Sequence, residues 1–211
     1  VLYGLNRLYE AKLSAEELCA MGARLGADLP FCLCGGTMLC EGIGERLSSL
    51  PELSDCFFVI VKPEIGMSTA ESYRIYDEHE AAGLEHGDLS AMSTALEAEN
   101  IQNVGKALYN ALECTVPDSV LKIKSALLKV GADGALMTGS GTAVFGIFQS
   151  IEKAAAARDA LSAEYGSIFI ARPAKSAVSE DESAPVFERL DSLGIKYECI
   201  NHPAVYTMDE M

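Results

Sequence analysis

The residue most able to do chemistry is a single carboxylate, Asp28, in the stretch LGADLPFCLCGG. Held in a partly dry pocket, such a group could act as a base toward an alcohol, but a short polar side chain is also a common turn cap. Because Pro30 restrains Leu29 to extended conformations, we expect Asp28 at the end of the preceding helix. A negative charge there costs ~0.3–1 kcal/mol, which argues against a purely structural role without excluding it.

The turn TGSGTAVFG is the second candidate. Gly139 and Gly141 permit positive φ, so that backbone N–H groups can surround an anion. Ser140 and Thr142 add hydroxyl groups. The dinucleotide fingerprint G-x-G-x-x-G fails because residue 144 is Val. A plain hairpin and a phosphate- or substrate-binding loop therefore both remain open.

Two weaker candidates follow. In VKPEIGMSTAESY, the polar residues Lys62, Ser68, Thr69 and Tyr73 come after an apolar run and at an expected helix start, where ligand contacts are frequent. Ser68 or Thr69 could equally be a helix cap. In NHPAVYT, His202 could be a general base, but no Ser or Cys nucleophile stands nearby, and a structural histidine is the better interpretation.

Composition narrows the class of protein. The 211 residues are 49% hydrophobic and 22% charged, which is typical of a globular chain. The net charge of -15 argues against a nucleic-acid surface. No apolar run approaches the ~20 residues that span a bilayer, and no signal-peptide pattern opens the chain. The seven cysteines form no recurrent C-x-x-C pair, and Cys32 and Cys34 alternate as in a strand, so we expect buried free thiols, no metal site and a cytoplasmic location.

The remaining elements must position these residues. Ser14 and Glu17 form a capping-box pattern. Helices are expected over residues 15–25, after Ser68 or Thr69, over 88–97, 101–113 and 117–131, and in SIEKAAAARDALSAEYG. Strands are expected in the hairpin GGTMLCEGIGERL, over 56–63, on both sides of the glycine turn, and in SIFIARP. From residue 56 this order predicts an α+β, split βαβ, ferredoxin-like arrangement, with its helices on one face of an antiparallel sheet.

Four stretches, taken in order, carry a resemblance to a known family. LGADLPFCLCGGTMLCEGIGERL, VIVKPEIGMSTAESYRIYD, NALE and GADGALMTGSGTAVFGIF together resemble the 4-diphosphocytidyl-2-C-methyl-D-erythritol kinases of the GHMP kinase superfamily, which serve non-mevalonate isoprenoid (terpenoid) biosynthesis. The resemblance covers roughly residues 1–172. It implies an α+β, two-domain GHMP-kinase fold, with residues 1–50 as the C-terminal part of the ATP-binding N-terminal domain and 51–173 as a ferredoxin-like C-terminal domain.

The resemblance also implies roles for individual residues. Asp28 would be the base that activates the substrate's 2-hydroxyl for attack on the γ-phosphate of ATP, and Thr69 and Tyr73 would contact the small-molecule substrate. The residues that match the family's glycine loop near the phosphates are Gly139, Ser140, Gly141 and Thr142. ATP would be the co-substrate, with Mg²⁺ accompanying it, and no residue is assigned as a metal ligand. Oligomeric state is left open.

The sequence departs from the family at its beginning. The Gly- and Ser-rich ATP loop and the lysine that would assist Asp28 find no counterpart in the 211 residues, and VLYGLNRLYEAKLS reads as the middle of a helix and the loop after it. We therefore expect a fragment that has no kinase activity by itself.

The end of the chain predicts a second component. Residues 174–184 are small, polar and acidic, as in a linker. Residues 185–211 resemble the opening helix and strand of bacterial prolyl-tRNA editing (aminoacyl-tRNA deacylase) domains, which implies tRNA as a possible partner of that truncated part only. Two other hypotheses therefore stay open: a non-catalytic ferredoxin-like ligand-binding module, and tRNA editing as the main role of a longer fusion.

Overall fold

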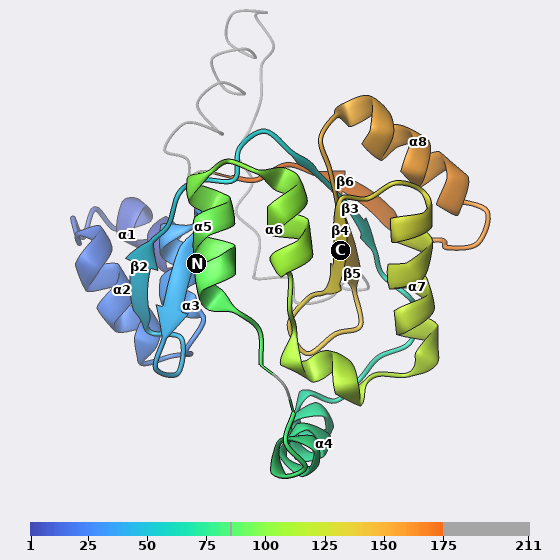
Figure 1. Ribbon diagram of the computed structural model, residues 1–211. Helices are drawn as coiled ribbons and strands as arrows, with labels where there is room; N and C mark the ends of the chain where they lie inside the picture. Colours follow the sequence, from blue (N-terminus) through green and yellow to red (C-terminus); the bar gives the residue numbers. More distant parts are fainter. Residues whose placement is uncertain (85, 175–211) are drawn as a thin grey trace, which may run out of the picture. The chain divides into compact units, whose positions relative to one another are not determined.

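The computed structural model describes residues 1–84 and 86–174, which form an α+β structure (Figure 1). The first part of the chain holds three short helices and a hairpin: α1 (Leu2–Leu8), α2 (Ala15–Ala23), α3 (Leu29–Cys34), β1 (Met38–Glu41) and β2 (Arg46–Ser49). The predicted capping box opens α2, where the Glu17 N–H donates to Ser14 Oγ at 3.2 Å and the Ser14 N–H donates to Glu17 Oε2 at 2.8 Å. The hairpin is also confirmed, since β1 and β2 pair antiparallel.

The segment after Asp28 differs from the prediction. Leu29 is the first residue of α3, so it is helical and not extended, and Cys32 and Cys34 lie on a helix and not on a strand. Pro30 occupies the first turn of α3, where its missing N–H leaves no hydrogen bond unmade. The cysteines of the described residues are free, as expected, but among them only Cys56 is buried.

A four-stranded antiparallel sheet forms the centre of the second part. Its strands are β3 (Phe57–Val61), β4 (Gly134–Met137), β5 (Val144–Phe148) and β6 (Ile168–Ala171), in the spatial order β4-β5-β3-β6. β5 lies between β4 and β3 and pairs with both, and β6 pairs with the other side of β3. This is the predicted ferredoxin-like order of strands.

The helices of this part are α4 (Thr69–Ala81), α5 (Leu89–Glu97), α6 (Ile101–Ala107), α7 (Asp118–Lys129) and α8 (Ile151–Leu161), with a 3-10 turn, η1, over Ala111–Thr115. The single helix expected over 101–113 is wrong. Leu108 has extended backbone angles (φ -59°, ψ 128°) and ends α6, and Asn110 then begins η1.

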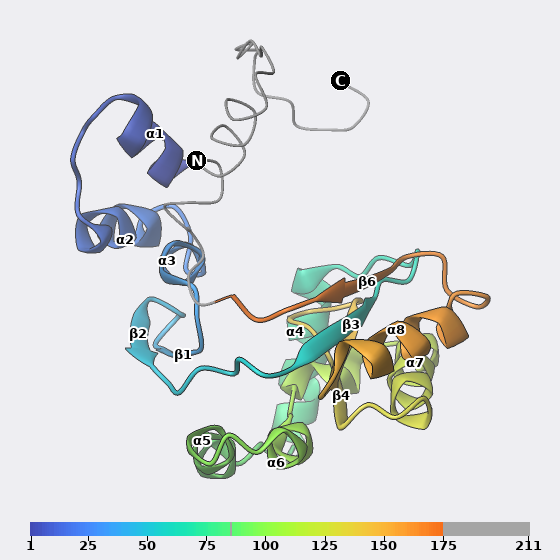
Figure 2. The same cartoon turned by 90° about the horizontal axis from the view of Figure 1, so that it is seen from above.

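Helices cover both faces of the sheet, which corrects the expectation of one covered face. Val59 and Phe148 face a core formed with α7 and α8, which includes Ile123 and Leu127. The alternate strand residues Phe58, Phe145 and Ile147 face a second cluster formed with α5 and α6. Figure 2 shows α5 and α6 side by side, seen end-on. The continuous apolar run of β3 follows from this, because both of its faces are covered.

Two predictions concern parts of the chain that the structure does not describe. The linker over 174–184 and the editing-like segment over 185–211 lie, apart from residue 174, outside the described residues. Within the described ranges, no helix has the length and apolar character required to cross a lipid bilayer.

Candidate active site

The paired ends of β3 and β5 bring together residues that are far apart in sequence. Val61 is the register partner of Val144, so Lys62 and Thr142 meet at the same end of the sheet. Lys62 Nζ donates to Thr142 Oγ1 at 2.7 Å, and Thr142 Oγ1 donates to the Ile65 carbonyl at 2.6 Å. Thr142 is only 1% exposed. The glycine turn is thereby tied to the segment that follows β3.

A second contact joins the same turn to the start of α4. Ser68 is the N-cap of α4, and its Oγ accepts from the Glu71 N–H at 3.5 Å. Because Ser68 caps the helix, the Thr69 hydroxyl is available for another partner, and it shares a hydrogen bond of 2.9 Å with Ser140 Oγ. Two of the predicted site residues, 71 positions apart, are therefore in direct contact.

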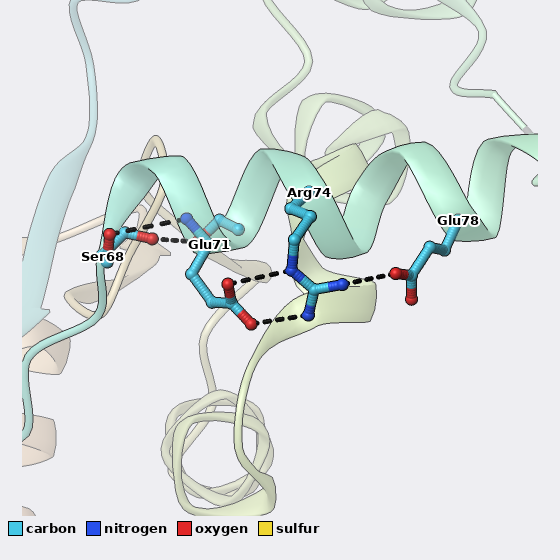
Figure 3. A network of polar contacts seen from close by, with 5 residues as sticks. Ser68, Glu71, Arg74 and Glu78 are labelled. Atoms are coloured by element: carbon cyan, nitrogen blue, oxygen red, sulfur yellow. Dashed lines mark hydrogen bonds and ion pairs between the residues drawn. The ribbon is translucent and has the colours of Figure 1, made fainter.

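Two ion pairs of Arg74 lie along the exposed side of α4. Figure 3 shows Arg74 between Glu71 and Glu78, with Arg74 Nη2 2.7 Å from Glu71 Oε1. All three side chains are more than half exposed, so each pair stabilises the helix only weakly.

Tyr73 lies four positions after Thr69, on the same face of the helix, and is 54% exposed. Its ring is accessible to a ligand, but no hydrogen bond among the described residues joins it to the glycine turn.

The glycine turn has a conformation that suits an anion. Gly139 and Gly141 have φ of 53° and 93°, as the sequence predicts. The turn is closed by the Thr138 N–H donating to the Ala143 carbonyl and the Gly141 N–H donating to the Thr138 carbonyl, each at 2.9 Å. Within residues 1–84 and 86–174, no acceptor takes the N–H groups of Gly139 and Ser140. Free N–H groups beside hydroxyl groups form the kind of concavity that holds phosphate oxygens.

Lys62 adds a positive charge at this place. Its ammonium group donates to Thr142 Oγ1 and, at 3.4 Å, to the Ile65 carbonyl, and both acceptors are neutral. No carboxylate of the described residues pairs with it, in a chain whose net charge is -15. The sequence pattern includes Lys62 among the polar residues that stand where ligand contacts are frequent, but the family resemblance assigns it no role. Its contact with Thr142 depends on strand pairing across 80 positions, which no local pattern reveals.

Two residues of the NALE stretch hold the turn from the other side. The Asn110 side-chain amide donates to the carbonyls of Met137 and Gly139, at 2.9 Å each. Glu113 Oε1 accepts from the Met137 N–H at 3.0 Å, and its Oε2 pairs with Lys124 at 2.6 Å. The sequence pattern marks both residues, because NALE places two polar residues within an apolar segment, but it predicts no role for either.

Asp28 lies in the first part of the chain, directly before α3. Its side chain makes no capping hydrogen bond, and it forms no hydrogen bond or ion pair with another described residue. The nearest turn is that of the β1–β2 hairpin, where a Cβ added to Gly44 would lie 3.5 Å from Asp28 Oδ1. Partial desolvation and the charge of Asp28 together raise the pKa of the Cys40 thiol. The capping alternative for Asp28 is therefore not supported, and its carboxylate is exposed and uncommitted.

No described contact joins Asp28 to the glycine turn, so the predicted residues fall into two groups. Thr69, Ser140 and Thr142 form one, with Lys62, and Asp28 forms the other. A metal site built by the protein does not fit either group, since the described residues contain no cluster of three or more His, Cys, Asp or Glu side chains.

Comparisons with known proteins agree on a family. The family described as GHMP kinases C terminal matches residues 92–167. Among curated proteins, 4-diphosphocytidyl-2-C-methyl-D-erythritol kinase of Carboxydothermus hydrogenoformans is 44% identical over 157 residues, covering 73% of this chain and 54% of that protein. The kinase of the same name from Bacillus subtilis is 42% identical over 151 residues, covering 70% and 51%. The chain spans about half the length of these relatives.

Solved structures show the same fold. A crystal structure of 4-(cytidine 5'-diphospho)-2C-methyl-D-erythritol kinase superposes with a TM-score of 0.64 at 27% identity, covering 80% of this chain and 60% of that one. Homoserine kinase from Cytophaga hutchinsonii gives 0.65 at 18% identity, covering 83% and 63%, and supports the fold alone. The described residues thus have the α+β fold found in GHMP kinases.

Proposed function

We propose that this chain is part of a small-molecule kinase that transfers the γ-phosphoryl group of ATP to the 2-hydroxyl of 4-diphosphocytidyl-2-C-methyl-D-erythritol, in isoprenoid biosynthesis. The observation that carries the proposal is the glycine turn, with free N–H groups at Gly139 and Ser140, hydroxyl groups at Thr69 and Ser140, and the Lys62 ammonium beside it. The 44% identity to a kinase of that name supplies the substrate.

Phosphoryl transfer asks mainly for positioning and for stabilisation of negative charge. The turn and Lys62 supply both for a phosphate group: N–H and hydroxyl donors fix its oxygens, and the ammonium offsets its charge. Tyr73, exposed one helical turn after Thr69, is placed to contact the rest of the substrate.

Asp28 would act on the attacking alcohol. In the proposed step the 2-hydroxyl oxygen forms a bond to the γ-phosphorus, the bond from that phosphorus to the bridging oxygen breaks, and ADP leaves. The hydroxyl proton passes to the Asp28 carboxylate. An exposed carboxylate with no hydrogen-bonding partner among the described residues is free to accept it. Mg²⁺ would accompany the nucleotide and neutralise its phosphate charge.

We propose that residues 1–50 belong to the ATP-binding domain and 51–173 to the C-terminal domain, and that the protein acts in the cytoplasm. The resemblance of residues 185–211 to aminoacyl-tRNA editing domains concerns residues outside the described part, and the matched proteins give it no support.

A chimera tests the function directly. The 157 matching residues of the Carboxydothermus hydrogenoformans kinase are replaced by those of this chain, and ADP release is followed with 4-diphosphocytidyl-2-C-methyl-D-erythritol as substrate. Turnover is expected. A chimera that binds the substrate but releases no ADP would support a non-catalytic ligand-binding module instead.

Asp28 is tested in the same chimera. General-base catalysis contributes about 10²–10⁴-fold, so Asp28→Asn is expected to lower kcat by at least about 100-fold while substrate still binds. The matched control is Asp159→Asn, the same change at an exposed ion pair on α8, where no effect is expected. Near-normal turnover in Asp28→Asn would remove this residue from the mechanism.

A further inference from the structure

Asn110 makes three hydrogen bonds at the point where β4 becomes the glycine turn. Its side-chain N–H₂ donates to the carbonyls of Met137 and Gly139, at 2.9 Å each, and its Oδ1 accepts from the Leu112 N–H at 2.9 Å. A primary amide has two donor hydrogens, and here each has its own acceptor. The two acceptors stand on either side of Thr138, the first residue of the turn.

Anchoring a carbonyl also orients the neighbouring N–H. In a planar trans peptide the C=O and the following N–H point in opposite directions. The Met137 carbonyl is bound by Asn110, and the N–H of the same peptide, that of Thr138, donates away from it to the Ala143 carbonyl. By the same geometry, the Gly139 carbonyl held by Asn110 turns the Ser140 N–H away from Asn110. That N–H has no acceptor among the described residues.

Glu113 adds a second set of contacts to the same end of β4. Its Oε1 accepts from the Met137 N–H at 3.0 Å, and Oε2 pairs with Lys124 on α7 at 2.6 Å. The Glu113 side chain is 17% exposed, so this pair is better shielded from solvent than those of α4. Both backbone polar groups of Met137 are consequently bound by side chains from the segment over residues 110–113.

We infer that Asn110 is a positioning residue for the anion-binding turn: by holding the carbonyls of Met137 and Gly139 on its own side, it presents the Ser140 N–H to a phosphate group of the substrate. A carbonyl oxygen turned toward that phosphate would repel it, whereas an N–H attracts it. Asn110 would not touch the substrate itself. The assignment rests on the proposed function for the identity of the anion, but the ordering of the turn does not.

The variant Asn110→Asp separates the donors from the acceptor. The carboxylate can still accept from the Leu112 N–H and cap η1, but it cannot donate to the two carbonyls. Asn100→Asp is the matched control, because Asn100 caps α6 by accepting from the Asn103 N–H at 3.0 Å, and no donation from its side chain is seen among the described residues. Asn110→Ser is a second variant, which keeps a capping oxygen without placing a charge against the carbonyls.

Two readouts are taken on the 211-residue chain. In ¹⁵N relaxation, the order parameter of Ser140 is expected to fall from about 0.85 to below about 0.6 in Asn110→Asp and Asn110→Ser, and to stay unchanged in Asn100→Asp. In calorimetric titration, losing an oriented, charge-assisted hydrogen bond should weaken binding of cytidine 5'-diphosphate roughly tenfold. Binding of cytidine, which has no phosphate, should change by less than about twofold, well below the factor of ten that 1.4 kcal/mol represents.

Each outcome decides the inference. A disordered turn with selective loss of the diphosphate supports it. An unchanged Ser140 order parameter overturns it, and so does an equal loss of cytidine and cytidine 5'-diphosphate. If the unaltered chain binds neither ligand, the proposed substrate is refuted for this chain, and the positioning role is then decided by the order parameter alone.

Discussion

The substitution Gly105→Ala tests whether close backbone contact between α6 and the start of β4 positions the NALE segment, residues 110–113. Gly105 lies inside α6, where alanine is intrinsically favoured by about 1 kcal/mol. In the structure, however, a Cβ at this position would lie 2.2 Å from the Asp133 carbonyl oxygen and 2.6 Å from its carbon. Ordinary van der Waals contact begins at 3.4 Å, so α6 would have to move away from β4 by about 1 Å.

The clash should exceed the propensity gain. Overpacking typically costs about 1–3 kcal/mol, and here the obstacle is backbone, which cannot rotate aside as a side chain can. We expect Gly105→Ala to lower the free energy of unfolding by about 2 kcal/mol, which for a chain of this size lowers Tm by roughly 4–8 °C. Urea denaturation and a thermal scan measure the two quantities.

Gly4 provides the control. It lies inside α1 with nothing within 4 Å of an added Cβ, so Gly4→Ala should raise stability by up to about 1 kcal/mol. If Gly105→Ala lowers the free energy of unfolding and Gly4→Ala raises it, the destabilisation comes from the contact between α6 and β4. A Gly105→Ala variant as stable as the parent chain would refute the packing described here. Because Asn110 follows α6 by three residues, the displaced helix should also weaken binding of cytidine 5'-diphosphate.

Two other predictions concern charge and pH. Lys62→Met should weaken binding of cytidine 5'-diphosphate roughly tenfold and make the binding less sensitive to salt, since a charge-assisted hydrogen bond contributes about 1.5–3 kcal/mol. Calorimetry at two salt concentrations measures this effect, with the exposed Lys122→Met as the control. An unchanged affinity at low salt would exclude Lys62 from the site. Burial, with a smaller contribution from the charge of Asp55, raises the pKa of the Cys56 thiol to about 11 from a usual value of 9.0. Below pH 9 the Cys56 thiol is protonated in both the folded and the unfolded chain. Between pH 9 and pH 11 only the unfolded chain loses this proton. The free energy of unfolding should therefore fall as pH rises through this range, by up to about 1.4 kcal/mol per pH unit. Urea denaturation from pH 7 to 11 measures that slope, and the same slope in Cys56→Ala would assign it to other groups.

Local rules predicted those parts of the fold that depend on neighbours in sequence. The capping box of Ser14 and Glu17, the strand expected over 56–63 and found as β3, and the helix expected over 117–131 and found as α7 all follow from short-range chemistry.

The failures have a common physical cause, since each involves a local rule that a wider context overrides. Pro30 disfavours a helical Leu29, yet it is well tolerated in the first turn of a helix, and α3 packs on α2 beside the buried Gly22. The resemblance identified Thr69, Ser140 and Thr142, and the structure joins them. Lys62 and Asn110 reach their partners across 80 and 29 positions, so only the pairing of β3, β4 and β5 makes their roles visible.

The hydrogen bonds that Asn110 and Glu113 make to Met137 also bear on self-association. β4 is the outer strand of its sheet, and an outer strand with unpaired N–H and C=O groups is a template on which another chain can add. At Met137 both of these groups are occupied by side chains, so a foreign strand finds no partner there. Variants that loosen the glycine turn should therefore aggregate more readily than equally destabilised variants elsewhere, because the residues that order this turn also keep one molecule from pairing with the next.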